Sequence, residues 1–167
     1  MIEVVIDILR PQFDEIIIAG GDVNRFGEHD LVCHPDPIAG RGALGGIYNG
    51  LLRNKDDWFF CCGCDMPLIK PEVIRTITGS LGEEDVLLPM VNNKRQPLHA
   101  VYRRTILPTV ERLLREAELF LPELFNRVNV RYLDEDNLSH IPDYHLSFVS
   151  LNSFEAVAQH QSHLDNL

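Results

Sequence analysis

The sequence has few positive charges. Its 15 lysine and arginine residues are outnumbered by 25 aspartate and glutamate residues, which gives a net charge of −10. A protein that binds nucleic acid or an anionic membrane needs a basic face, so this balance argues against both kinds of partner. A small anionic ligand remains compatible with the composition, because a bound cation can invert the local field.

Long apolar runs and paired cysteine motifs are also absent. No stretch is long enough to span a bilayer, and residues 1–7 lack the basic start of a secretory signal. Three of the four cysteines lie in one expected strand, where neighbouring side chains point to opposite faces and cannot easily pair. We therefore expect a cytoplasmic protein without disulfides, whose cysteines are buried apolar thiols rather than metal ligands. These residues are Cys33, Cys61, Cys62 and Cys64.

The order of the apolar segments predicts an α/β fold. With 167 residues, of which 45% are hydrophobic and 24% charged, the chain suggests one globular domain over residues 1–167. Strands alternate with helices, so we expect three layers: a mostly parallel sheet with helices on both faces. Expected strands are 15–19, 30–33, 58–64, 85–88, 98–102, 128–132 and 147–150. Expected helices are 2–9, 46–53, 71–80, 104–117, 121–125 and 153–164.

The chain opens on a helix rather than a strand. In a β-α-β unit, a helix such as 2–9 connects two parallel strands. The strand that should precede this helix is missing from the sequence. We therefore expect the fold to lack its first strand.

The most informative stretch is the uncharged run 58–64, which ends on Asp65 and is followed by Met66 and Pro67. Such a run predicts a central strand buried on both faces, and Pro67 cannot continue its ladder. Asp65 then lies at the carboxyl end of the strand, where open α/β sheets bind ligands. A carboxylate there can hold Mg²⁺ against a phosphate. The alternative is an ordinary turn or helix-capping carboxylate.

Two neighbouring features suggest a ligand on the same sheet edge. Residues 40–46 form a glycine-rich turn before a helix, where backbone N–H groups can meet an anion and Arg41 could add a cation. The alternative, that the glycines only permit close packing, is the more common case for such loops. Asp36 lies between Pro35 and Pro37, which hold it stiffly enough to orient a base, a ribose or a cation. An Asx turn is its simpler interpretation.

Asn152 is the last candidate. With Glu155 it has the spacing of a helix capping box, which explains it structurally. It also follows the expected strand 147–150 and so would share the edge with Asp65. A capping role and a ligand contact are compatible in one residue.

Four motifs in this order resemble the molybdenum cofactor guanylyltransferases of the MobA type, a branch of the sugar-nucleotide-transferase-like nucleotidyltransferases. They are His34-Pro35-Asp36, Gly40-x-Gly42-x-Leu44-Gly45-Gly46, Cys64-Asp65-Met66-Pro67 and Gln96-Pro97-Leu98-His99-Ala100-Val101-Tyr102. The resemblance covers nearly the whole chain. It implies a Rossmann-like nucleotidyltransferase fold that transfers GMP from GTP to molybdopterin cofactor, releases pyrophosphate and uses Mg²⁺.

The resemblance also assigns roles to individual residues. Asp65 matches the metal-binding aspartate, and Asn152 matches an asparagine near the acceptor phosphate and the metal. Asp65 and Asn152 are thus the expected catalytic residues. The expected nucleotide-binding positions are Asp36, Gly40, Gly42, Leu44, Gly45 and Asp65.

The sequence departs from the family at its start. The family opens with a strand, a Gly-Gly turn, an Arg-Met-Gly segment and a lysine, which together cradle the triphosphate. Gly20-Gly21 does not replace them, because it follows a later strand, and Ser150 stands where relatives often carry asparagine.

The missing cradle has energetic consequences. Each lost charge-assisted hydrogen bond is worth about 1.5–3 kcal/mol, so we expect weak GTP binding and poor turnover. The neighbours of a missing strand must pair with each other or expose their edges, which favours self-association into a homo-oligomer. A relative that uses CTP or another acceptor, and a catalytically silent binding protein, are the alternative functions.

Overall fold

The computed structural model describes residues 1–20, 31, 33–38 and 40–165. None of the helices in this part combines the length and the apolar character needed to cross a membrane. Of the predicted elements, Asp30 and Val32 of the strand 30–33 and Gly21 of the Gly20-Gly21 turn lie outside the described residues.

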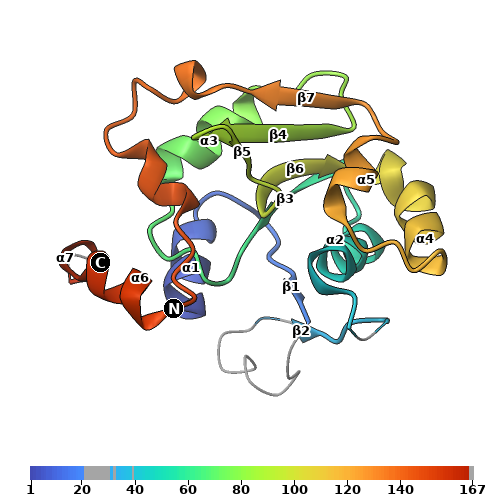
Figure 1. The fold of residues 1–167 in the computed structure, drawn as a ribbon, viewed down its shortest axis with the longest axis horizontal. Helices are drawn as coiled ribbons and strands as arrows, with labels where there is room; N and C mark the ends of the chain where they lie inside the picture. Colours follow the sequence, from blue (N-terminus) through green and yellow to red (C-terminus); the bar gives the residue numbers. More distant parts are fainter. Residues whose placement is uncertain (21–30, 32, 39, 166–167) are drawn as a thin grey trace.

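The larger of two sheets has five strands (Figure 1). Its order is β3 (Trp58–Cys62), β6 (His99–Arg103), β4 (Val86–Val91) and β5 (Lys94–Arg95), and β7 (Val130–Leu133) also pairs with β4. Strand β6 runs antiparallel to β3 and β4, whereas β7 runs parallel to β4. The sheet is therefore mixed rather than mostly parallel, because the link from β4 to β6 is too short to hold a crossover helix.

Helices cover both faces of this sheet, as predicted. On one face, α2 (Gly42–Arg53), α4 (Leu107–Arg115) and α5 (Leu121–Phe125) enclose the largest cluster of buried side chains. On the other face, α3 (Pro71–Gly79) packs against β4, β6 and β7, and α1 (Ile2–Leu9) packs beside it. The α/β class with helices on both sides is thus confirmed.

The smaller sheet pairs β1 (Ile18–Ala19) with β2 (Cys33–His34) in parallel. The predicted strand 15–19 is reduced to its last two residues, and Ile16 and Ile17 are only half-buried. Among the described residues, neither β1 nor β3 has a partner on its second edge. The described strands therefore form two separate sheets, with β1 and β3 at facing edges.

This split corrects the prediction for 58–64. Strand β3 lies at the edge of the five-stranded sheet, and all five of its residues are half-buried rather than buried. Its side chains do alternate between two apolar clusters, with Phe59 on one face and Phe60 on the other. The strand is exposed along its open edge, not on its faces.

The C-terminal segment also differs from prediction. The expected strand 147–150 is instead the 3₁₀-helix η4 (Tyr144–Phe148), and the expected helix 153–164 is divided into α6 (Phe154–Gln159) and α7 (Gln161–Leu164). The fully buried Ser147 Oγ accepts a hydrogen bond from the Lys70 backbone N–H (2.9 Å). This side-chain contact anchors the segment where a strand ladder was expected. Two further 3₁₀-helices are η2 (Arg104–Ile106) and η3 (Glu135–Asn137).

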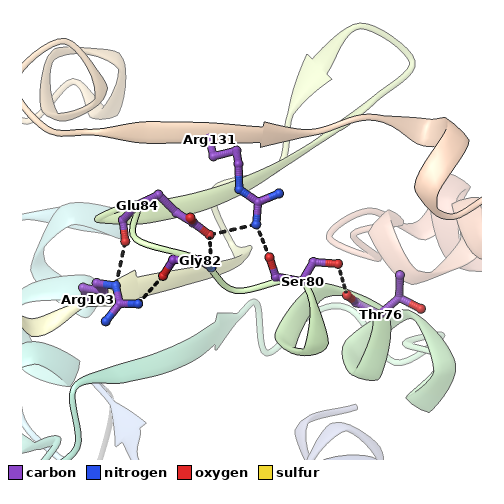
Figure 2. Close-up of polar contacts among 6 residues, drawn as sticks. All are labelled: Thr76, Ser80, Gly82, Glu84, Arg103 and Arg131. Atoms are coloured by element: carbon purple, nitrogen blue, oxygen red, sulfur yellow. Dashed lines mark hydrogen bonds and ion pairs between the residues drawn. The ribbon is translucent and has the colours of Figure 1, made fainter.

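Two arginines fix the loop between α3 and β4 (Figure 2). Arg131 Nη2 donates to Glu84 Oε1 (2.9 Å) and to the Ser80 carbonyl, while Arg103 Nε donates to the Glu84 carbonyl (2.7 Å). Burial of Glu84, which is 5% exposed, opposes its ionisation. The hydrogen bond and charge of Arg131, together with backbone donors, outweigh that effect and lower the Glu84 pKa.

Candidate active site

Asp65 lies just past the carboxyl end of β3, as predicted, and three contacts fix it. The Leu151 N–H donates to the Asp65 carbonyl (2.7 Å), and the Ser150 hydroxyl donates to Asp65 Oδ2. The Gly63 backbone lies close to the carboxylate, because a Cβ on Gly63 would be only 2.6 Å from Asp65 Oδ1. These contacts hold a half-buried carboxylate in one orientation.

Asp65 offers one anchored carboxylate rather than an enclosed set of metal ligands. The described residues contain no cluster of three or more His, Cys, Asp or Glu side chains that could enclose a metal. Mg²⁺ usually keeps several waters and binds through one or two carboxylates plus substrate phosphates. A single anchored carboxylate at a sheet edge meets that requirement, and the Ser150 contact leaves lone pairs on Oδ1 available.

Asp36 is exposed and lies against Gly20 at the end of β1. A Cβ on Gly20 would lie 3.2 Å from Asp36 Oδ1, and Gly20 has a positive φ of 84°. Asn49 of α2 holds the preceding turn, because its Nδ2 donates to the carbonyls of His34 (2.9 Å) and Pro35 (3.2 Å). The chain around Asp36 is thus fastened to α2.

The helix that follows the glycine-rich turn begins earlier than predicted. Helix α2 begins at Gly42, so only Gly40 and Arg41 belong to the turn. Gly40 and Gly42 have positive φ values of 75° and 53°, and a Cβ on either would meet nothing within 4 Å. An open backbone surface therefore surrounds the first turn of α2.

Leu44 and Gly45 lie deeper than these two glycines. Leu44 is 1% exposed and packs in the main core, so its side chain faces away from any ligand at the surface. A Cβ on Gly45 would lie 2.9 Å from the Arg41 Cβ, so close packing accounts for that glycine. Arg41 itself lines a cavity of about 450 Å³ with Tyr48 and Glu111, on the side of α4.

Asn152 does not cap the last helix. Ser153 is the N-cap of α6, and its Oγ accepts a hydrogen bond from the Ala156 N–H (3.1 Å). The predicted capping box is therefore absent: the N-cap lies one residue later, its N3 residue is Ala156, and the Asn152 side chain is exposed. Asn152 follows Leu151, whose N–H binds Asp65, so its backbone lies close to the candidate metal ligand.

Cys61 and Cys62 of β3 are half-buried, and the neighbouring His99 is fully buried. Burial raises the pKa of Cys61 to about 12 and raises that of Cys62 still further. His99 is fully buried between Phe60 and Phe148, with ring centroids 5.0 and 4.6 Å away. Burial lowers the His99 pKa to about 3, so the imidazole is neutral at physiological pH.

The candidate residues fall into two groups on either side of the split. The "Asp36 half" consists of Asp36, Gly20, Gly40 and Gly42, and belongs to the smaller sheet and the start of α2. The "Asp65 half" consists of Asp65, Gly63, Ser150 and Asn152. Sequence reasoning missed the positioning role of Ser150, because its partner lies 85 residues away and no local pattern signals that contact.

Comparisons with known proteins find related sequences along most of the chain. The family model of the MobA-like NTP transferase domain matches residues 1–129. A molybdenum cofactor guanylyltransferase from Desulfosudis oleivorans is 30% identical, over 93% of this chain and 77% of its own length. A probable molybdenum cofactor guanylyltransferase from Pelotomaculum thermopropionicum is 33% identical, over 92% and 75%.

Solved structures share the fold. Molybdopterin-guanine dinucleotide biosynthesis protein A from Archaeoglobus fulgidus has a TM-score of 0.84 at 22% identity, over 99% of this chain and 86% of that one. A 4-diphosphocytidyl-2C-methyl-D-erythritol synthase from Anaerococcus prevotii has a TM-score of 0.70 at 12% identity, over 98% and 85%. At these identities the likeness concerns the fold alone.

Proposed function

The chain belongs to the MobA-like NTP transferase family, and we propose that it joins the GMP part of GTP to the phosphate of molybdopterin cofactor and releases pyrophosphate. The observation that supports this reaction best is the anchored Asp65 carboxylate at the end of β3. Relatives named for guanylyl transfer to the molybdenum cofactor supply the substrates of the proposal.

In this proposal the residues act by positioning and charge rather than by covalent chemistry. Asp65 would hold Mg²⁺, and the ion would supply neutralisation of the phosphate charge during in-line transfer. Ser150 and Gly63 fix the direction in which the carboxylate points. Asp36 and the open first turn of α2 would orient the nucleotide, and Asn152 would contact the acceptor phosphate.

Binding without catalysis is the second candidate function. The observation that favours it is the split between the two sheets, because the Asp36 half and the Asp65 half belong to different sheets. Each half could retain its ligand contact while the geometry for transfer is lost. Nucleotide binding must therefore be measured separately from turnover.

The test compares Asp65→Ala with Asp57→Ala in an assay of pyrophosphate release from GTP and molybdopterin cofactor. Asp57 is an exposed aspartate at the opposite end of β3, so its replacement controls for a general loss of negative charge. We expect Mg²⁺-dependent release that falls about 100-fold or more in Asp65→Ala and stays unchanged in Asp57→Ala. Equal activity of the two variants would refute the metal-binding role of Asp65.

The same preparation distinguishes the alternatives. Binding of GTP without pyrophosphate release, measured by calorimetry, would support the silent binding protein. Turnover of CTP in preference to GTP would support a cytidylyl transfer. Excess EDTA, which chelates Mg²⁺, should abolish pyrophosphate release. Re-addition of Mg²⁺ should restore it.

A further inference from the structure

Two residues of the last of the four sequence motifs, Leu98 and His99, support the end of β3. The Leu98 carbonyl accepts a hydrogen bond from the Gly63 N–H (3.0 Å). His99 lies opposite Cys62 in the ladder between β3 and β6. Gly63 comes two residues before Asp65, so this end of β6 holds the chain that carries the candidate metal ligand.

His99 also contacts the second support of Asp65. Its ring meets that of Phe60 edge to face, with centroids 5.0 Å apart, and lies 4.6 Å from the ring of Phe148. Phe148 is the last residue of η4 and comes two residues before Ser150, whose hydroxyl donates to the Asp65 carboxylate. One imidazole therefore lies between the strand that presents Asp65 and the segment that orients it.

Stability does not account for a histidine at this position. His99 is 0% exposed, and neither of its ring nitrogens has a hydrogen-bond partner among the described residues. A buried polar group without a partner destabilises a fold, whereas an apolar side chain of similar volume in its place is neutral or stabilising. Departures of this kind from the rules of a stable core are typical of positions that serve a functional site.

We propose that His99 is a positioning residue that acts on Asp65 through Phe148. The flat imidazole fills the space between two aromatic rings, and its thickness sets how closely the segment after η4 lies against the end of β3. That separation determines whether the Ser150 hydroxyl and the Leu151 N–H reach Asp65. Leucine has a similar volume but is not flat, so it would displace Phe148 and loosen both hydrogen bonds. The effect on turnover rests on the proposed function, whereas the effect on the two hydrogen bonds does not.

The first test needs no turnover and measures amide hydrogen exchange in the wild type and in His99→Leu. The reporting amide is the Leu151 N–H, which donates to the Asp65 carbonyl (2.7 Å). The control is the Arg103 N–H at the other end of β6, which donates to the Asp85 carbonyl (2.8 Å). We expect exchange at Leu151 to become about tenfold faster or more in His99→Leu, with exchange at Arg103 unchanged. Equal exchange at Leu151 in the two chains would overturn the proposal.

Unfolding in urea shows whether the histidine serves the fold instead. We expect the midpoint of urea unfolding of His99→Leu to equal or exceed that of the wild type, because the variant removes a buried polar group without a partner. A lower midpoint, or a variant that does not fold, would show that the histidine serves the core and would overturn the proposal.

The second test measures the kinetics of pyrophosphate release. In the proposed function the nucleotide is oriented by the Asp36 half, so His99→Leu should lower kcat about tenfold or more and leave the KM for GTP within about twofold. Phe148→Leu alters the same contact from the other side and should have the same effect. Because both act by one route, the double variant should be no slower than the slower single variant. Losses that multiply in the double variant would show two independent routes and contradict the proposal.

The two tests separate a failure of this inference from a failure of the proposed function. A wild type that releases no pyrophosphate, together with faster Leu151 exchange in His99→Leu, would refute the transferase activity and support the positioning role. An active wild type whose kcat is unchanged in His99→Leu would support the activity and refute the positioning role.

Discussion

The two sheets differ in how firmly they are held. In the five-stranded sheet, β4 is paired on both sides by β6 and β7, and Val86, Leu87 and Leu88 are each 0% exposed. In the smaller sheet, β1 pairs over two residues with β2, and only Ile18 of the two is buried. Because one half of the candidate site rests on each sheet, the Asp65 half is built on the firmer support and the Asp36 half on the weaker one.

The largest expected effect is a difference in stability between core substitutions in the two sheets. Leu88→Ala removes a fully buried side chain from the main core and should lower the free energy of unfolding by about 2–5 kcal/mol. Ile18→Ala should cost about 2 kcal/mol or less, because half-buried neighbours around β1 can close the space. Urea unfolding followed by circular dichroism measures both, and equal losses would contradict the comparison.

The second prediction concerns the glycines beneath the two carboxylates. Gly63→Ala puts a Cβ 2.6 Å from Asp65 Oδ1, so the carboxylate must move while the backbone can stay. We expect turnover to fall about tenfold or more with little loss of stability, since small misplacements at a reacting centre are costly. Gly20→Ala places alanine at a φ of 84°, where strain of about 1–2 kcal/mol should lower stability as well as GTP affinity.

The control for both glycines is Gly79→Ala in α3. A Cβ at Gly79 meets nothing within 4 Å, and alanine is the better helix former. Thermal unfolding and pyrophosphate release should therefore be unchanged or slightly improved. If Gly63→Ala released pyrophosphate as fast as Gly79→Ala, the present position of the Asp65 carboxylate would not be required for turnover.

The features that could be predicted from the sequence are those that depend on local signals. Helices 2–9 and 121–125 have the predicted bounds, because their apolar spacing and their ends are local signals. Asp65 at the end of β3 followed equally from a local pattern, an apolar run stopped by proline. The antiparallel course of β6 was missed because sheet order depends on long-range pairing, which residue spacing does not encode.

The remaining errors are concentrated in segments whose structure depends on distant partners. Segment 147–150 has strand-like residues, but Ser147 and Ser150 bind Lys70 and Asp65 instead of a neighbouring strand. The run 58–64 reads as a central strand, yet β3 lacks a second neighbour among the described residues and is left at an edge. The local sequence predicts correctly which side chains are apolar on each face of a strand. It does not predict which strand pairs with its edge.

The smallest expected effect tests why the five-stranded sheet is the firmer one. Arg131→Met removes the partner of the 5%-exposed Glu84. Because the Arg131 side chain is itself 43% exposed, water can replace part of the pair, and the loss should be about 1 kcal/mol near pH 7. The Glu84 pKa is lowered in the folded chain from its ordinary value of 4.5. Its contribution to stability is therefore complete above pH 4.5 and disappears as the pH falls through the lower folded value.

The free energies of unfolding of the wild type and Arg131→Met, measured in urea, should therefore converge as the pH is lowered below about 4.5. The control is Arg75→Ala, which also removes an arginine but breaks an exposed pair with Glu72. Exposed pairs contribute about 0–1 kcal/mol, so Arg75→Ala should change little at any pH. Amide exchange in β4 and β7 should rise in Arg131→Met, and exchange in β1 should not, since the Arg131 contacts lie entirely within the larger sheet and its α3 loop. A pH-independent gap between wild type and Arg131→Met would show that Arg131 stabilises the loop through packing and its Ser80 hydrogen bond alone. The ionised Glu84 would then contribute nothing to the difference between the two sheets.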